Sequence, residues 1–117
     1  MVEIRIEIEF AAAHHLPHHP GVCRRPHGHN YRLLVCVKRP VDPGSGMVMD
    51  FAELERLVWE HAIGELDHRD LNEILANPTA ENIVVWIWDR LAPVVPGLSR
   101  LELWETSRYS AVYEGRR

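Results

Sequence analysis

The sequence predicts an α+β domain in which two helices pack on one face of a four-stranded antiparallel sheet. Residues 2–10 and 28–39 alternate in the period-two pattern of strands. Two capped stretches with helical spacing follow, starting near residues 50 and 79, and two short strand patterns close the chain. The order strand, strand, helix, helix, strand, strand therefore predicts two hairpins that bracket two helices.

The first two strands carry apolar side chains on a shared face. In residues 2–10 the even positions are apolar and the odd positions from Glu3 to Glu9 are charged, as expected for a half-buried strand. In residues 28–39 the apolar face begins at Tyr31. Leu34 and Cys36 make the middle of this strand apolar on both faces, so we interpret Cys36 as a core residue.

Both helices have start and stop signals. Asp50 is a good N-cap, and Glu53 completes an acidic variant of the capping box. We expect this helix to stop at Gly64, before an irregular connection over residues 65–78. Thr79 can cap the second helix, and prolines end it. Its inner face would comprise Ile83, Trp86, Ile87 and Leu91.

The last two strands form a short hairpin. Leu101, Leu103 and Glu105 share one face of the third strand, and residues 111–114 make the fourth. The opposite sheet face, with Glu3, Glu7, Arg32 and Glu102, is too charged for a dry core and suits a polar channel. With 117 residues and no linker, we expect a single domain over 1–117.

Composition excludes several classes of protein. The net charge of −4 argues against nucleic acid as a partner, and no apolar run approaches the ~20 residues that cross a bilayer. The N-terminal segment does not have the pattern of a signal peptide, and two cysteines make no disulfide framework. A cytoplasmic, reduced protein fits best.

Six of the eight histidines lie between residues 14 and 29. His27 and His29 are two apart at the start of a strand, so their imidazoles face the same side. His14 follows the neighbouring strand, and the three can converge on a zinc ion with a fourth position left open. Surface histidines in a polar loop are the alternative. His15, His18 and His19 are either further ligands or solvated.

Cys23 precedes His27 by four residues and has two functional interpretations, beside that of a buried, inert cysteine, which a loop this polar disfavours. As a fourth zinc ligand it would close a structural site. As a thiolate beside an open metal it would be a base, its pKa lowered by the cation.

Two acidic positions are also candidates. Asp67 can fix the tautomer of His68 and make it a proton shuttle, or the two form an ordinary cap or ion pair. Glu105 on an apolar face can accept from a ring with two adjacent N–H donors, or lie in solvent paired with Arg108.

Taken together, six blocks carry a resemblance that covers nearly the whole chain. The sequence resembles the 6-pyruvoyltetrahydropterin synthase / 6-carboxytetrahydropterin synthase family, whose motifs occur here in the same order. The blocks are Phe10–His14, Cys23–Tyr31, Gly46–Phe51, Leu66–Asn72, Asn77–Asn82 and Trp104–Thr106.

This resemblance implies the tunnelling fold, in which the sheets of several subunits join into a barrel around a polar channel. It implies a homotrimer or homohexamer with active sites where subunits meet. Family roles carry over by position: zinc ligands His14, His27 and His29; cysteine base Cys23; proton-relay pair Asp67 and His68; pterin contacts Glu105 and Thr79.

Within the family, the spacing from Cys23 to His27 and the compact loop before it resemble the bacterial carboxy-type lyases. Those enzymes convert 7,8-dihydroneopterin triphosphate to 6-carboxytetrahydropterin on the way to queuosine. A pyruvoyl-type synthase and a non-catalytic zinc or pterin module are the alternatives. Arg24 and Arg25 either meet the triphosphate or are solvated. Pro26 and the additional histidines depart from the family pattern.

Overall fold

A long hairpin of two strands forms the base of the molecule. The computed structural model describes residues 1–116. In it, β1 (Val2–His14) and β2 (His27–Arg39) pair antiparallel over their whole length, from Val2 opposite Arg39 to His14 opposite His27. The predicted strands are therefore correct but longer than expected, and His14 is the last residue of β1 rather than a residue beyond it.

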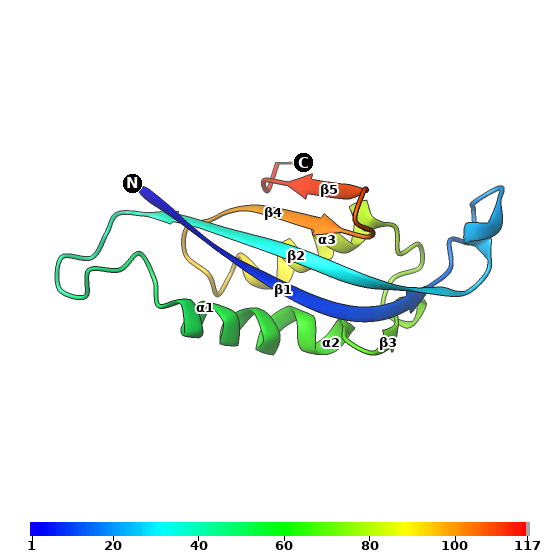
Figure 1. Ribbon diagram of the computed structural model, residues 1–117, viewed down its shortest axis with the longest axis horizontal. Helices are drawn as coiled ribbons and strands as arrows, with labels where there is room; N and C mark the ends of the chain where they lie inside the picture. The colour runs from blue at the N-terminus through cyan, green and yellow to red at the C-terminus, as the bar shows by residue number, and fades with distance from the viewer. Residues whose placement is uncertain (117) are drawn as a thin grey trace.

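The sheet has five strands in the order β3-β1-β2-β4-β5. The four predicted antiparallel strands are confirmed, with β4 at Leu98–Trp104 and β5 at Ser110–Tyr113. The fifth, β3 (Arg69–Asp70), lies in the predicted irregular connection and pairs parallel to Ala12 and Ala13 of β1. The α+β class holds, and the helices lie on one side of the sheet (Figure 1).

The first helical stretch continues past its expected end. The helix α1 (Phe51–Val58) runs through a π-helical turn, Trp59–Ile63, into α2 (Gly64–Leu66). The prediction that Gly64 stops the helix is wrong, because the N–H of Gly64 bonds to the Trp59 carbonyl and continues the turn. The Asp50 cap is confirmed by its bond from the Glu53 N–H, whereas the Glu53 side chain pairs with Arg56.

The second helix, α3 (Ala80–Leu91), has the predicted cap, since the Thr79 hydroxyl accepts from the Asn82 N–H. Ile83, Ile87 and Leu91 are fully buried as expected. Trp86 is only half-buried, with the Arg90 guanidinium over its ring. Two short 3-10 helices, Val22–Arg24 and Leu71–Glu73, lie near the end of the hairpin.

The core lies between the helices and one sheet face. It joins Tyr31, Leu33 and Val35 to helix residues such as Leu54 and Ile87. Cys36 is also fully buried, as expected for a core residue. It lies on the charged face of the sheet, opposite Arg5 on β1 and Arg100 on β4. No helix within residues 1–116 is long and apolar enough to span a bilayer.

Candidate metal centre and active site

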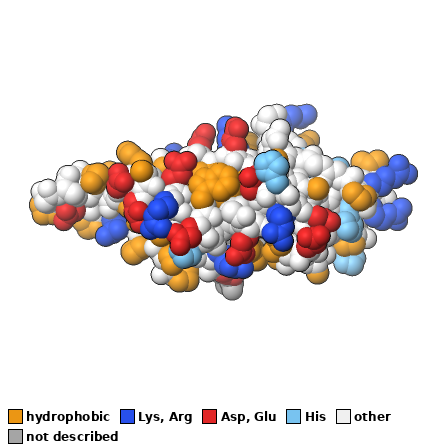
Figure 2. All heavy atoms as spheres, turned by 90° about the horizontal axis from the view of Figure 1, so that it is seen from below, with side chains coloured by type: hydrophobic (Ala, Val, Ile, Leu, Met, Phe, Trp, Pro, Cys, Tyr) orange, Lys and Arg blue, Asp and Glu red, His pale blue; other side chains and the backbone are white. Residues whose placement is uncertain are grey.

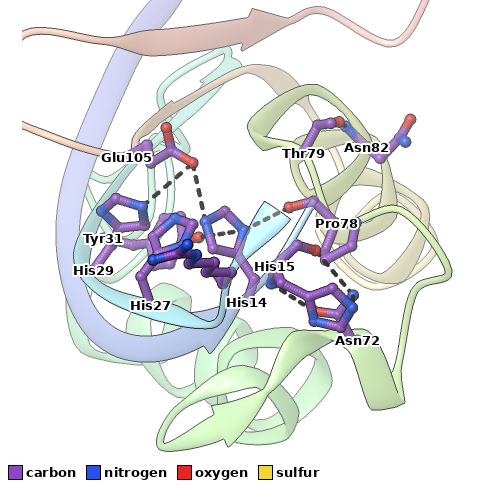
Figure 3. Close-up of polar contacts among 11 residues, drawn as sticks. His14, His15, His27, His29, Tyr31, Asn72, Pro78, Thr79, Asn82 and Glu105 are labelled. Carbon is purple, nitrogen blue, oxygen red and sulfur yellow. Dashed lines mark hydrogen bonds and ion pairs between the residues drawn. The ribbon is translucent and has the colours of Figure 1, made fainter. Parts of the chain in front are cut away.

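The loop end of the β1–β2 hairpin brings three histidines together. His14 and His27 are direct cross-strand partners, and His29 lies two residues further along β2. Their ring centroids are 4.6 to 5.0 Å apart, and one nitrogen from each ring lies within 4.8 Å of the others. Figure 3 shows the three imidazoles turned toward one another. The sequence prediction of a converging trio agrees with this geometry.

Backbone carbonyls set the orientation of two of these rings. The Nδ1–H of His14 donates to the carbonyl of Pro78 at 2.8 Å, and the Nδ1–H of His27 donates to the carbonyl of Arg25 at 2.8 Å. These bonds fix the tautomer in which Nε2 carries the free lone pair. Histidines that ligate metals are commonly held by such bonds, so both rings are prepared to bind through Nε2.

Two of the other ring nitrogens have no hydrogen-bond partner within the described chain. The Nε2 atoms of His14 and His29 are buried and unbonded, which is costly unless something satisfies them. Burial lowers the pKa of both imidazoles, against the opposing pull of the Glu105 carboxylate. Neutral imidazoles with free lone pairs are the form that binds metal. This three-histidine group can therefore hold a metal ion.

Glu105 lies directly after β4 and turns its carboxylate toward the histidines. Its Oε1 is 3.4 Å from Nε2 of His14 and 3.7 Å from Nε2 of His29. Instead of pairing with Glu105, Arg108 lies over the ring of Tyr109. Glu105 also borders a cavity of about 400 Å³ that Ala80, Tyr109 and Ser110 help to line. One carboxylate thus stands between the metal group and a cavity.

Asp67 and His68 form a pair beside β1. Asp67 accepts from the N–H of Ala11 at 3.1 Å, and Nδ1 of His68 lies 3.0 Å from its other oxygen. The Ala11 bond, followed by the contact with His68, holds the pKa of Asp67 below its usual value. His68 has φ of 59° and a side chain 81% exposed. Such strain in a residue other than glycine is common at functional sites.

His68 and His29 line one open groove of about 500 Å³, together with the small residues Ala11 to Ala13 of β1. The structure therefore brings His68, one member of the predicted relay pair, to the same groove as His29 of the three-histidine group. Cys23 is not among the residues that line it.

Cys23 lies in the 3-10 turn Val22–Arg24 and is half-buried. It is not part of the metal group, the only such group found within residues 1–116. Arg24, Arg25 and His18 are exposed at the same end of the molecule, where Figure 2 shows basic and histidine side chains gathered.

Sequence reasoning missed three contributors to this site. Tyr31 continues the spacing of His27 and His29, and its buried hydroxyl lies 3.3 Å from Nδ1 of His14, so the alternation could have found it. Pro78 acts through its carbonyl, which no sequence pattern marks. Asn72 accepts from the N–H of His15, the residue after His14, and no spacing in the sequence marks this contact.

The chain is thus a small five-stranded α+β domain whose three-histidine group could hold a metal ion, with a carboxylate and two cavities beside it. The family described as 6-pyruvoyl tetrahydropterin synthase has a sequence model that matches residues 3–116. The chain belongs to this family.

Three relatives are similar to this chain in sequence. The 6-carboxy-5,6,7,8-tetrahydropterin synthase of Synechocystis is 46% identical over 92% of this chain and 88% of its own. The 6-pyruvoyl tetrahydrobiopterin synthase of Homo sapiens is 37% identical over 81% of this chain and 72% of its own. The dihydroneopterin monophosphate aldolase of Pyrococcus furiosus is 43% identical over 75% of this chain and 77% of its own.

A solved structure agrees over almost the whole fold. The 6-pyruvoyl tetrahydropterin synthase of Caenorhabditis elegans superposes with a TM-score of 0.88 at 28% identity, covering 98% of this chain and 96% of that one. This confirms the resemblance drawn from the six sequence blocks, and with it the tunnelling fold.

Proposed function

We propose that this protein is a zinc-dependent 6-carboxytetrahydropterin synthase of queuosine biosynthesis. It would convert 7,8-dihydroneopterin triphosphate and water to 6-carboxytetrahydropterin, acetaldehyde and triphosphate. The observation that carries the proposal is the group of His14, His27 and His29, with two unpaired buried Nε2 atoms facing Glu105. The identity to the Synechocystis enzyme supports the carboxy-type product.

Zinc suits a three-nitrogen site and would supply a Lewis acid close to the hydroxyls of the substrate side chain. The protein's own residues have separate tasks. Glu105, at the border of the metal group and the 400 Å³ cavity, is placed to accept from the adjacent N–H donors of a pterin ring. Ala80 lines that cavity directly after Thr79, which supports a contact to the ring from this capping turn.

Proton transfer falls to three residues. Cys23 removes the carbon-bound proton that the neighbouring imine makes acidic. His68, oriented by Asp67, carries protons at the groove that also contains His29. Arg24 and Arg25 add positive charge near Cys23, which suits a triphosphate.

The proposal extends to the assembly and its location. We infer a homotrimer or homohexamer, because the outer edge of β1 is paired only at Ala12 and Ala13 and His68 is exposed in the single chain. The two free cysteines are consistent with a reducing cytoplasm.

A product assay tests the reaction. The purified zinc-loaded protein is incubated with 7,8-dihydroneopterin triphosphate, and its products are separated by mass spectrometry. Acetaldehyde with 6-carboxytetrahydropterin is the expected result. Triphosphate release with the carbon side chain retained would instead show a pyruvoyl-type synthase, the activity named for the human relative.

A third outcome has its own support in the aldolase relative from Pyrococcus furiosus. Cleavage of the side chain to 6-hydroxymethyldihydropterin would show that activity. No conversion of the pterin while zinc is bound would leave a binding module and overturn the enzymatic proposal. Replacing Cys23 with alanine should abolish turnover without loss of zinc, since the thiol lies outside the histidine group.

A further inference from the structure

The side chain of Asn72 grips the backbone of His15, the residue that follows His14. Its Oδ1 accepts from the His15 N–H at 2.9 Å, and its Nδ2 donates to the His15 carbonyl at 3.0 Å. The same Nδ2 lies 3.4 Å from the His15 ring, and Figure 3 shows the two side chains together. A side-chain amide thus makes the pair of bonds that a neighbouring strand would make.

These bonds extend a continuous contact along the edge of β1. Ala11 exchanges bonds with Asp67 and His68, and Ala12 and Ala13 pair with β3. Asn72 adds the next rung at His15, beyond the last residue of the strand. The segment 67–72 is therefore fastened beside β1 from Ala11 to His15.

The contact continues from His15 into the loop that carries Cys23. The N–H of Leu16 donates to the carbonyl of Cys23 at 2.7 Å, and the Leu16 carbonyl accepts from His19. Hydrogen bonds and the chain itself thus connect Asn72, through His15 and Leu16, to the backbone of Cys23. Whatever fixes His15 also fixes the start of the loop against which the Cys23 backbone is held.

The side-chain amide of Asn72 makes no hydrogen bond within the 3-10 helix that contains it. Asp70 caps the 3-10 helix Leu71–Glu73, accepting from the Asn72 N–H at 3.0 Å. The amide group is consequently free to act on β1, and it uses both its donor and its acceptor there.

We propose that Asn72 is a positioning residue, which holds the Cys23 loop (residues 15–26) against β1 through His15 and Leu16. The proposal rests on the proposed function only in taking Cys23 as the base. Asn72 touches neither the metal group nor Cys23, so it acts on the thiol through the backbone alone.

The test uses the zinc-loaded full chain with Asn72→Ala. Losing both bonds should speed amide hydrogen exchange at Leu16 about tenfold, the order expected for loss of a supporting hydrogen-bond pair. The rate at which iodoacetamide alkylates Cys23 should rise at least about threefold, because the loop is held less firmly. Cys36 is fully buried and does not interfere. In turnover, kcat should fall while KM for the pterin stays close to the original value.

Glu73→Ala is the matched control, since it alters an exposed side chain in the same 3-10 helix. It should leave Leu16 exchange and Cys23 alkylation unchanged. Asn72→Asp keeps the acceptor for the His15 N–H and should give intermediate rates, and it serves also if the alanine variant does not fold.

Unchanged exchange at Leu16 and unchanged alkylation of Cys23 in Asn72→Ala would overturn the proposal. Exchange that rises equally at Leu16 and at the core residue Leu33 would overturn it too, because Asn72 would then only support global stability. If the wild-type protein turns over no pterin, the proposed function fails, yet the exchange and alkylation rates still decide the role of Asn72.

Discussion

The chemistry of the site depends on which ring nitrogen of each imidazole carries the free lone pair. Two rings donate from Nδ1 to backbone carbonyls, at Pro78 and Arg25, and this leaves Nε2 for a ligand. The burial of His14 and His29 lowers the pKa of both rings and so favours their neutral form. His14 is thus oriented by a contact remote in sequence, since Pro78 precedes α3 whereas His14 ends β1. His27 is oriented by Arg25, only two residues away.

Removing one imidazole should abolish tight metal binding. We expect His29→Ala to weaken zinc binding by more than the roughly 10–100-fold that loss of a supporting contact costs, because a ligand itself is lost. His18→Ala, at an exposed loop position, should keep the wild-type zinc content. Equilibrium competition with a chromogenic chelator measures both. Equal affinity of the two variants would contradict the three-histidine site.

The metal-free protein should lose stability as the pH falls. His14 and His29 have pKa values below 6.5 in the folded chain, so below about pH 6.5 the unfolded chain binds more protons. Their contribution is fully present above that pH and is lost progressively toward their folded pKa values. Urea unfolding from pH 8 to 5 should show this slope, and His29→Asn should flatten it. A slope that His29→Asn leaves unchanged would contradict the assignment.

At the scale of elements, the hairpin and the helix caps follow from local rules. Alternation predicted β1 and β2, and the Asp50 and Thr79 caps are as expected. Local rules could not predict β3, because its two residues pair with β1 only after the chain has folded back. Nor could they predict that Cys36 has Arg5 and Arg100 as its neighbours, since these neighbours depend on the register of the strands.

The π-helical turn at Trp59–Ile63 explains why Gly64 is present although the helix does not end there. A Cβ at Gly64 would lie 2.7 Å from the Trp59 carbonyl oxygen, which the turn holds in place. We therefore expect Gly64→Ala to lower the free energy of unfolding by about 1–2 kcal/mol, the overlap outweighing the better helix propensity of alanine.

Urea denaturation measures this effect, with Gly44→Ala as the control. Gly44 lies in an exposed turn where an added Cβ meets only ordinary contact, 3.4 Å from an Asp42 oxygen. Its replacement should stay within about 0.5 kcal/mol of the wild type. A stabilising Gly64→Ala would mean that the π-helical turn relaxes to a regular helix at no cost.

The whole molecule is elongated for its length. Its radius of gyration is 15.1 Å and its extents are 53 × 25 × 25 Å, whereas a compact chain of this size has a radius of about 13 Å. The long hairpin causes this shape (Figure 1) and leaves one sheet face carrying Glu7, Arg32 and Glu102 without a covering layer. The charge on that face was evident in the sequence, but the open edge beside it was not.

An open edge strand next to a polar face is a surface that a second copy of the chain can extend. We expect the purified protein to form trimers or hexamers, with native mass spectrometry giving masses that are three or six times 13.5 kDa. Because association stabilises the folded chain, the thermal midpoint should rise with protein concentration. Glu73→Ala changes an exposed side chain on the 3-10 helix, which lies beside the covered end of β1, so it should give the same masses and concentration dependence. A monomer whose midpoint is independent of concentration would contradict the proposed assembly and leave the exposed His68 without a neighbouring subunit to serve.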